Sequence, residues 1–425
     1  MDPEMILSDL IKIDSANPPG NELAVARYLK ELFDRAGIPN QIIETGDNRG
    51  NFIARLGKGK KKLLFLSHTD VVPAGDGWDF EPFSGAIEGG MVHGRGALDC
   101  KSLVAAEAHA MLTLAADGGL EGTLIFAATA DEERGGECGI RYLIEHHREL
   151  VQADFAVNEG GEEPLVINGR AVYFIQVGEK GTAWSRLTAK GVSCHGSVPA
   201  LGDNAVVKMA GAVQRLARYK PAVCLTPEVK TLLKELALLQ GLEPEADAGN
   251  VDHLLDQFAD KDLAEVLRAM TRMTVSPNVI QGGIKTNVVP DSCWAEVDVR
   301  IMPGQDREYV LAELRRCAGE EIDIDPAGYH PPSFSGAGTE YFHLLESTIR
   351  ELTGAAAVLP HLSPGATDSR FLREAGIPAY GIAVMAPDFN PALRVTIHGK
   401  NERIDVKSVR MEAEFLKTLA KRRLG

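Results

Sequence analysis

The stretch LIFAATADEERGG at 124–136 constrains the fold of this chain more than any other. Its first half is a continuous apolar run, which is typical of a strand buried on both faces of a sheet. The run leads directly to Glu132 and Glu133, and neighbouring side chains on an extended backbone point to opposite sides. One glutamate can therefore hold a cation while the other transfers a proton. An acidic loop exposed to solvent is the simpler interpretation of this pair alone.

Other segments also place polar residues at predicted strand ends. LLFLSHTDVVPAG, which begins at 63, ends its apolar run with His68 and Asp70. These side chains point to the same side, so Asp70 can accept a hydrogen bond from one imidazole nitrogen while the other binds a metal. A histidine that merely ends a core strand is the alternative. Asp99 precedes a helix expected at 102–116 and could simply cap it, and DFAVNEGG ends in Glu159.

The order of predicted elements indicates two domains, one inserted into the other. Strands and helices alternate through the first third of the chain, a doubly wound α/β pattern whose ligands lie at the carboxyl ends of strands. Near 176 the pattern changes to alternating strands, a helix, a helix-rich stretch and two long strands. We therefore expect a catalytic domain with a mixed sheet at 1–175 and 299–425. The inserted α+β domain, with a four-stranded antiparallel sheet, is expected at 176–298.

Length and composition exclude several classes of protein. A chain of 425 residues can bury two cores. Its formal net charge of -15 argues against nucleic acid as a partner. The sequence contains neither an export signal nor an uncharged stretch that could span a bilayer, so we expect a cytoplasmic protein with no membrane partner. Six cysteines without C-x-x-C spacing predict neither disulfides nor a thiolate cage, so any metal should be held by oxygen and imidazole.

The candidate ligands come from five separate segments. Two imidazoles and several carboxylates suit zinc, cobalt or manganese, and they exceed what one tetrahedral ion needs. Two ions bridged by one carboxylate would use the set, and such a centre both activates water and polarises a carbonyl. The residues are His68, Asp99, Glu132, Glu133, Glu159 and His398.

Eight ordered motifs resemble those of a dinuclear-zinc metallopeptidase family. This family includes aminoacylase, acetylornithine deacetylase, succinyl-diaminopimelate desuccinylase, glutamate carboxypeptidase and carnosine-type dipeptidases. The motifs are SHTDVVPAG, HGRGALDCKS, ATADEERGG, NEGG, CHGSVPALGDNAV, DVRIMPG, GATDSRF and IHGKNERI.

The resemblance implies a role for each candidate ligand. His68, Asp99 and Glu159 would hold one ion, and Asp99, Glu133 and His398 the other, with Asp99 as the bridge. Glu132 would be the general base that takes a proton from the bridging water, and Asp70 would steady His68. A cis peptide is implied at Asp99–Cys100, where relatives usually have methionine or a similar residue after the aspartate.

For the inserted domain the resemblance implies dimerisation or a lid function. His195 would stabilise the oxyanion in the partner's active site. Asn287 and Arg300 would grip the substrate carboxylate, since a guanidinium binds a carboxylate in bidentate fashion; a surface ion pair is the alternative for Arg300. Gly365 and Thr367 would lie beside the substrate. Ala366 departs from the Gly-Thr-Ser motif of the desuccinylases.

We therefore expect a homodimeric amidohydrolase with two zinc ions per chain, for which cobalt or manganese could substitute. Its substrate would be an N-acyl amino acid-like compound with a free carboxylate. The alternative enzyme is a dipeptidase or carboxypeptidase-type exopeptidase, and the former needs a carboxylate for the free α-amine. A catalytically dead binding or scaffold protein would lack a ligand or Glu132, and the sequence retains them all.

Overall fold

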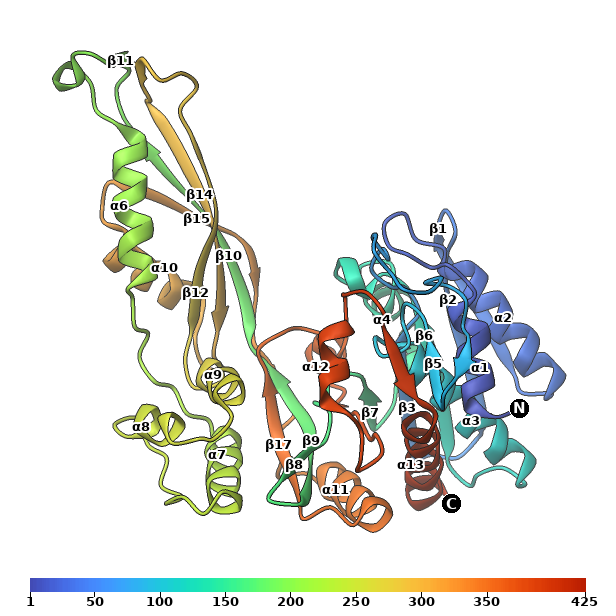
Figure 1. Cartoon of the computed structure of the whole chain (residues 1–425). Coiled ribbons are helices and arrows are strands. Elements are labelled where there is room, and N and C mark those ends of the chain that lie inside the picture. Colours follow the sequence, from blue (N-terminus) through green and yellow to red (C-terminus); the bar gives the residue numbers. More distant parts are fainter. The chain divides into compact units, whose positions relative to one another are not determined.

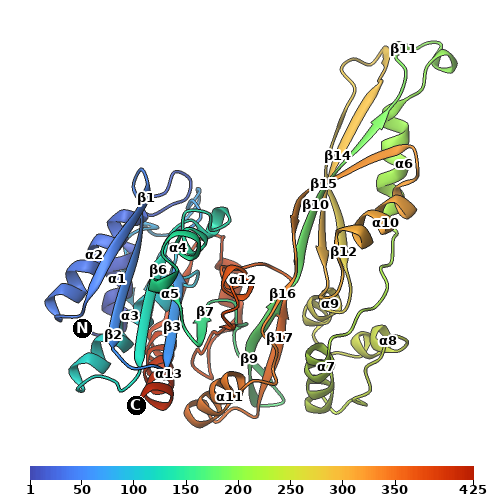
Figure 2. The same ribbon diagram turned by 180° about the vertical axis from the view of Figure 1, so that it is seen from behind.

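A computed structural model describes all of residues 1–425, which divide into two compact units. The first unit comprises Met1–Val177, Ser335–His361 and Thr367–Gly425. The second comprises Gly178–Phe334 and Leu362–Ala366. Each unit has its own sheet and its own apolar core (Figures 1 and 2).

The first unit is built on a mixed sheet with parallel central strands. Strand β3 runs parallel to β6 and β7, and β7 runs parallel to β18, whereas β1 and β2 are antiparallel. His68, the last residue of β3, is in register with Thr129, the last residue of β6, so both strands end at one edge. The order is β1 (Asn40–Gly46), β2 (Arg49–Gly57), β6 (Thr123–Thr129), β3 (Lys62–His68), β7 (Phe155–Asn158), β18 (Ala379–Gly381), β9 (Arg170–Glu179) and β16 (Ser333–Phe334), with β8 (Leu165–Ile167) and β17 (Ala357–Ser363) also on β9.

Alternate side chains of the central strands enter two different apolar layers, as a pleated strand requires. Leu63 and Phe65 pack with α1 (Pro3–Ile11), α2 (Glu22–Arg35), α3 (Lys101–Ala116), α11 (Glu340–Thr353) and α13 (Val406–Leu424). Leu64 and Leu66 pack with α4 (Ile140–His146), α5 (Arg148–Val151) and α12 (Ser369–Glu374). Truncating the fully buried Phe65 to alanine would cost about 3–5 kcal/mol. The predicted doubly wound fold with a mixed sheet is confirmed.

A small sheet joins two distant segments of the first unit. Strand β5 (Met91–His93) pairs with β4 (Ile87–Glu88) on one side and with β19 (Arg403–Asp405) on the other. The loop that contains Asp99 and the loop that contains His398 are therefore anchored next to each other.

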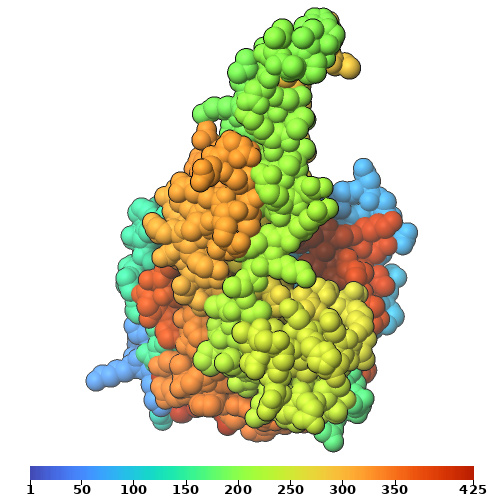
Figure 3. Space-filling model, turned by 90° about the vertical axis from the view of Figure 1, so that its left-hand side faces the viewer, coloured from blue at the N-terminus to red at the C-terminus, as the bar shows by residue number.

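The second unit contains the predicted four-stranded antiparallel sheet. Its order is β12 (Thr274–Gly282), β14 (Ser292–Ile301), β10 (Gly181–Lys190) and β15 (Ile322–His330). Helices α6 (Ala205–Ala217) and α10 (Arg307–Ala318) pack on one face of it, and Figure 3 shows their green and orange residues side by side. The unit also contains α7 (Pro227–Leu239), α8 (Val251–Asp256), α9 (Lys261–Ala269) and a short ribbon of β11 (Cys194–His195) with β13 (Val288–Val289).

The limits of the second unit differ from the expected 176–298. Strand β9, which we expected to begin the inserted sheet, belongs to the first sheet, and β15 supplies the fourth strand instead. The unit therefore continues through α10 and β15 to Phe334. None of the helices in either unit combines the length and the apolar character needed to cross a membrane.

Candidate metal centre

His68 lies at the edge of the first sheet with its Nε2 atom directed at two carboxylates. This nitrogen is 3.0 Å from Asp99 Oδ1 and 3.5 Å from Glu159 Oε2. The other ring nitrogen, Nδ1, lies 2.9 Å from the backbone carbonyl oxygen of Asp70. Donation from Nδ1 to this carbonyl leaves the lone pair of Nε2 free for a cation.

Asp99 joins two groups of candidate ligands. Its Oδ1 atom faces His68, and its Oδ2 atom lies 3.0 Å from His398 Nε2, which is also 3.2 Å from Glu133 Oε2. Potential ligand atoms of Asp99, Glu133 and His398 all lie within 4.8 Å of one another, as do those of a second group around His68 that includes Glu159. The five residues expected as metal ligands therefore meet around one carboxylate.

The turn after β6 separates the two adjacent glutamates. Asp131 has a left-handed backbone with φ of 72°, and the 3-10 helix η1 (Glu132–Arg134) follows it directly. The carbonyl oxygen of Asp131 accepts hydrogen bonds from the backbone N–H groups of Arg134 and Gly136, which closes the turn. Glu133 joins a ligand group, whereas Glu132 belongs to neither of them.

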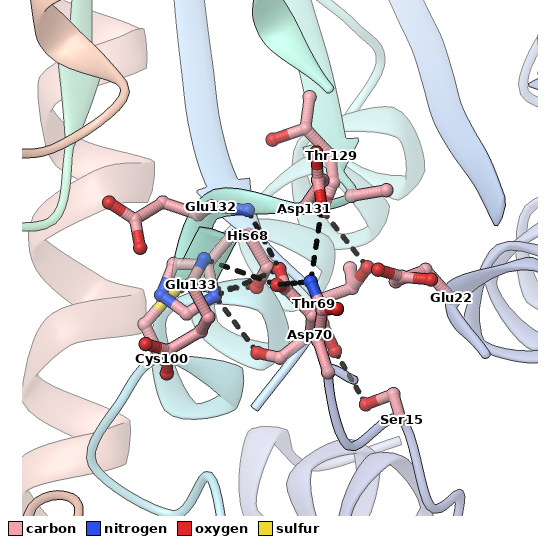
Figure 4. A network of polar contacts seen from close by, with 12 residues as sticks. Ser15, Glu22, His68, Thr69, Asp70, Cys100, Thr129, Asp131, Glu132 and Glu133 are labelled. Carbon is pink, nitrogen blue, oxygen red and sulfur yellow. Dashed lines mark hydrogen bonds and ion pairs between the residues drawn. The ribbon is translucent and has the colours of Figure 1, made fainter. Parts of the chain in front are cut away.

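Asp70 organises this turn through its carboxylate (Figure 4). Its Oδ1 accepts a hydrogen bond from the backbone N–H of Glu132 (3.1 Å), and its Oδ2 accepts from the N–H of Glu133 (3.2 Å) and from the Asn17 amide (2.8 Å). The carboxylate is 3.6 Å from His68 Nδ1, so the contact of this nitrogen with the Asp70 carbonyl is closer. Asp70 thus positions both glutamates as well as His68.

Arg49 also supports the turn, a role that no sequence motif indicates. Its guanidinium donates to Glu22 (2.8 Å), Asp131 (2.9 Å) and the side-chain oxygen of Asn17 (2.9 Å). The side chain of Glu22 is fully buried, and that of Arg49 is 12% exposed. The only local signal for this network is the sequence NPPG at 17–20, which indicates a turn but no partner for Arg49.

Glu402 holds the loop that presents Asp99. Its buried carboxylate accepts hydrogen bonds from the backbone N–H groups of Gly96 (2.9 Å), Leu98 (2.7 Å) and Asp99 (3.1 Å), and from the guanidinium of Arg95 (2.6 Å). Arg95 also donates to the carbonyl oxygen of Gly399 (2.6 Å). Both residues lie within the motifs HGRGALDCKS and IHGKNERI, but nothing in these motifs indicates that the two side chains pair.

The cluster carries a surplus of negative charge. Hydrogen bonds to Asp99 and Glu133 raise the pKa of His398 to about 10. Burial disfavours a charged His68, yet its acidic neighbours, Cys100 and Glu159 first, raise the pKa of the imidazole well above its usual value. Imidazoles that bind protons at neutral pH mark a site where a cation is favoured. Glu133 Oε1, which is buried without a hydrogen-bond partner, is a further free acceptor. These residues fit a divalent metal.

Three carboxyls at the site have raised pKa values. Burial, together with the nearby charge of Glu159, raises the pKa of Glu132 well above its usual range. Burial also raises the pKa of Glu159, and it raises that of Asp368 to about 7. Asp368 was not singled out from the sequence. Its Oδ2 atom accepts a hydrogen bond from the Thr129 hydroxyl (3.3 Å), and its Oδ1 atom is buried without a partner.

The segment GATDSRF is shared between the units. Gly365 belongs to the second unit, where its backbone N–H donates to the Ser363 hydroxyl (3.1 Å). Thr367 belongs to the first unit, where its hydroxyl accepts from the backbone N–H of Ser369 (3.2 Å) at the start of α12.

His195 and Asn287 lie next to each other in the second unit. The backbone N–H of Gly196 donates to the carbonyl oxygen of Asn287 (2.8 Å), and His195 is in register with Val288. A Cβ on Gly196 would come within 3.0 Å of the Asn287 backbone, so glycine suits this close approach. The His195 ring is exposed, with its Nδ1 2.8 Å from the Ser197 hydroxyl.

Arg300 lies elsewhere in the second unit, on β14. Its Nε and one terminal nitrogen contact the two carboxylate oxygens of Asp298 at 2.8 and 3.2 Å, and its guanidinium carbon lies 5.9 Å from the centre of the Trp184 ring. The ion pair that was the alternative interpretation of Arg300 is therefore present.

Comparisons with known proteins find relatives over most of the chain. Residues 64–422 match the sequence model described as peptidase family M20/M25/M40. A probable succinyl-diaminopimelate desuccinylase of Staphylococcus aureus is 26% identical over 86% of this chain and 84% of its own length. The human N-fatty-acyl-amino acid synthase/hydrolase is 29% identical over 83% of this chain and 72% of its own length. The structure of an M20 family metallo-carboxypeptidase from Sulfolobus solfataricus has the same fold, with a TM-score of 0.71 at 22% identity and 99% coverage of both chains.

Proposed function

Because the chain belongs to peptidase family M20/M25/M40, and is therefore a metal-dependent hydrolase, we propose that it is a dinuclear zinc amidohydrolase acting on N-acyl amino acids with a free carboxylate. The observation that carries this proposal is the position of Asp99. Its two carboxylate oxygens face two different imidazoles, His68 and His398, each 3.0 Å away. A carboxylate in this position suits a bridge between two cations.

The ligand roles follow from the two groups around Asp99. His68 and Glu159 would hold one ion with Asp99, and Glu133 and His398 would hold the other. Bound zinc would supply Lewis acidity toward the substrate carbonyl and would lower the pKa of a bound water. The chain itself keeps the Nε2 atom of His68 free and fixes the acidic turn through Asp70.

Glu132 is the proposed general base and acid. Its backbone N–H is held by Asp70, and its side chain points away from Asp70 in Figure 4. Burial favours its protonated form, which suits a carboxyl that accepts a proton during attack and gives it to the leaving nitrogen. Asp70 and Asn17 keep the turn in place while that proton moves.

The substrate class is supported by the names of two relatives. One is a probable desuccinylase of an amino acid, and the other is a hydrolase of N-fatty-acyl amino acids. We propose that Asn287 and Arg300 bind the free carboxylate and that Gly365 and Thr367 line the substrate site. On substrate binding, Arg300 would release its ion pair with Asp298 and pair with the substrate carboxylate instead. Since Ala366 replaces the threonine of the desuccinylase motif, we expect a different acyl group from succinyl.

Chelation and a Glu132→Gln variant test the reaction. Removal of metal should abolish hydrolysis of N-acyl amino acids, and zinc or cobalt should restore it, with about two ions bound per chain. Glu132→Gln should lower kcat by about 100-fold or more while metal content stays, because the amide keeps its shape but cannot accept the proton. Glu137→Gln, an exposed change in the same segment, serves as the control.

Three results would count against this proposal. Full activity in a metal-free sample would refute the metal centre. Loss of metal from the Glu132→Gln protein would mean that Glu132 is a ligand. Turnover of dipeptides with free amines, in preference to N-acetyl and longer N-acyl amino acids, would identify an exopeptidase instead.

We further propose that the chain forms a homodimer through the second unit and that His195 acts in the active site of the partner. A His195→Ala chain and a Glu132→Gln chain should each be nearly inactive. Co-expression with different tags should give a heterodimer with restored activity, because one of its two sites would combine an intact Glu132 with an intact His195. A fully active monomer would refute this arrangement, as would a heterodimer no better than its parents.

A further inference from the structure

We propose that the thiol of Cys100 is an additional ligand of the ion held by His68, Asp99 and Glu159. The inference rests on the proposed function, because it requires that the metal centre exists. It also departs from the expectation, based on cysteine spacing, that oxygen and imidazole alone would hold the metal.

The position of the sulfur carries this inference. Potential ligand atoms of His68, Asp99, Cys100 and Glu159 all lie within 4.8 Å of one another. Zinc binds its ligands at about 2.0–2.3 Å and can expand from four to five ligands, which would keep a position for the water beside four protein atoms. Small rotations of the side chains would therefore let all four atoms reach one ion.

The surroundings of Cys100 are unusual for a structural cysteine. The residue is 2% exposed, and a buried free cysteine usually packs as a small apolar side chain. Cys293 behaves in that way, since it belongs to the apolar core of the second unit. The sulfur of Cys100 instead lies among an imidazole and two carboxylates, and Figure 4 includes Cys100 in the polar network.

The backbone fixes Cys100 at this place. The residue immediately precedes α3, and its carbonyl oxygen accepts the first backbone hydrogen bonds of that helix from Leu103 (3.0 Å) and Val104 (3.2 Å). Cys100 is thus held beside the ligands by the same helix start that follows Asp99.

The thiol has only one weak hydrogen-bond partner within the chain. It donates to the carbonyl oxygen of His68 over 3.4 Å, and a thiol is a poor donor. On metal binding the S–H bond would break, the sulfur electron pair would bind the ion and the proton would leave to solvent. Sulfur favours zinc and cobalt over manganese, so this position should select the softer ions.

Cobalt substitution and X-ray absorption test the proposal on the whole protein. Cobalt-loaded wild type should show a thiolate-to-cobalt charge-transfer band in the near ultraviolet in addition to visible d–d bands. The zinc protein should show a sulfur scatterer at about 2.3 Å. Cys100→Ser should lose both signals and bind zinc about 10–100-fold more weakly. Cys293→Ala, which removes a distant buried thiol, should keep both signals.

The outcomes separate this inference from the proposed function. Visible cobalt bands without the charge-transfer band, together with a zinc shell of nitrogen and oxygen alone, would refute ligation by Cys100 and leave the metal centre intact. Failure of the wild type to bind cobalt or zinc would instead refute the proposed function itself. Since the sulfur scatterer is measured on the wild type, a poorly folded variant would not prevent a decision.

Discussion

Glu412 should make the first unit less stable as pH rises, and Glu412→Gln should remove this effect. Glu412 lies on α13 and is 3% exposed. Burial raises the pKa of its carboxyl from 4.5 to about 7, although a hydrogen bond from the backbone N–H of Val384 opposes this. The neighbouring Glu107 is also buried, and burial raises its pKa well above the usual value, with a further contribution from the charge of Glu412.

The sign of the effect follows from proton binding. Below pH 4.5 the carboxyl is protonated in both the folded and the unfolded chain, so burial adds no pH-dependent cost. Between pH 4.5 and about 7 the unfolded chain releases the proton while the folded chain keeps it, so the free energy of unfolding falls as pH rises. Above that range the loss is complete and amounts to about 3 kcal/mol, at about 1.4 kcal/mol per pKa unit.

Urea unfolding of wild type and Glu412→Gln at about pH 5 and about pH 8 measures this loss. A chelator in every sample keeps metal binding from adding its own pH dependence. The stability of the variant relative to wild type should increase by about 2–3 kcal/mol between the two pH values, because glutamine cannot ionise but keeps an acceptor for Val384. Glu414→Gln, an exposed change on the same helix, should shift stability by less than about 0.5 kcal/mol at either pH. An equal effect of Glu412→Gln at both pH values would refute the reasoning.

Two further substitutions test the networks that support the metal centre. Arg49→Met should destabilise the first unit by about 3–5 kcal/mol in urea unfolding, because it leaves buried Glu22 and Asp131 without their cation. Arg49→Lys should recover part of this loss. An unchanged midpoint of urea unfolding in Arg49→Met would contradict the supporting role of Arg49. Glu402→Gln should weaken metal binding by about 10–100-fold in titrations with a competing chelator, because the Asp99 loop loses a charged acceptor for three backbone N–H groups. An unchanged affinity for the metal would show that the Asp99 loop keeps its shape without Glu402.

The sequence predicted the first sheet and the candidate ligands because both depend on local pattern. Continuous apolar runs identified β3 and β6, and parallel strands that end at one edge bring His68 close to the turn of Glu132 and Glu133. The split between the two glutamates was also anticipated, although the structure achieves it through a left-handed residue, Asp131, rather than through a regular strand.

The remaining features depend on pairings between distant segments. Arg95 and Glu402 are more than 300 positions apart, and no local pattern indicates that a buried arginine will meet that carboxylate. Strand β15 lies within 299–425, which we assigned to the catalytic domain, because alternating apolar residues indicate a half-buried strand without identifying its partner strand. The proximity of Cys100 to the ligands was missed because spacing rules for cysteine describe pairs of thiols rather than one.

The segment that forms most of the second unit begins and ends at adjacent points of the first sheet, so it can change in evolution without disturbing that sheet. Gly178 and Phe334 are paired neighbours on β9 and β16, and the backbone N–H of Ser335 donates to the carbonyl oxygen of Val177 (2.8 Å). Residues Gly178–Phe334 thus form one long insertion whose two ends are joined by the pairing of β9 with β16. The entropic cost of closing such a loop grows by only about 0.6 kcal/mol for each doubling of its length. Recombination can lengthen, shorten or exchange this insertion while the strands that carry the candidate ligands keep their register. The second unit also includes the short segment Leu362–Ala366, which lies outside this insertion.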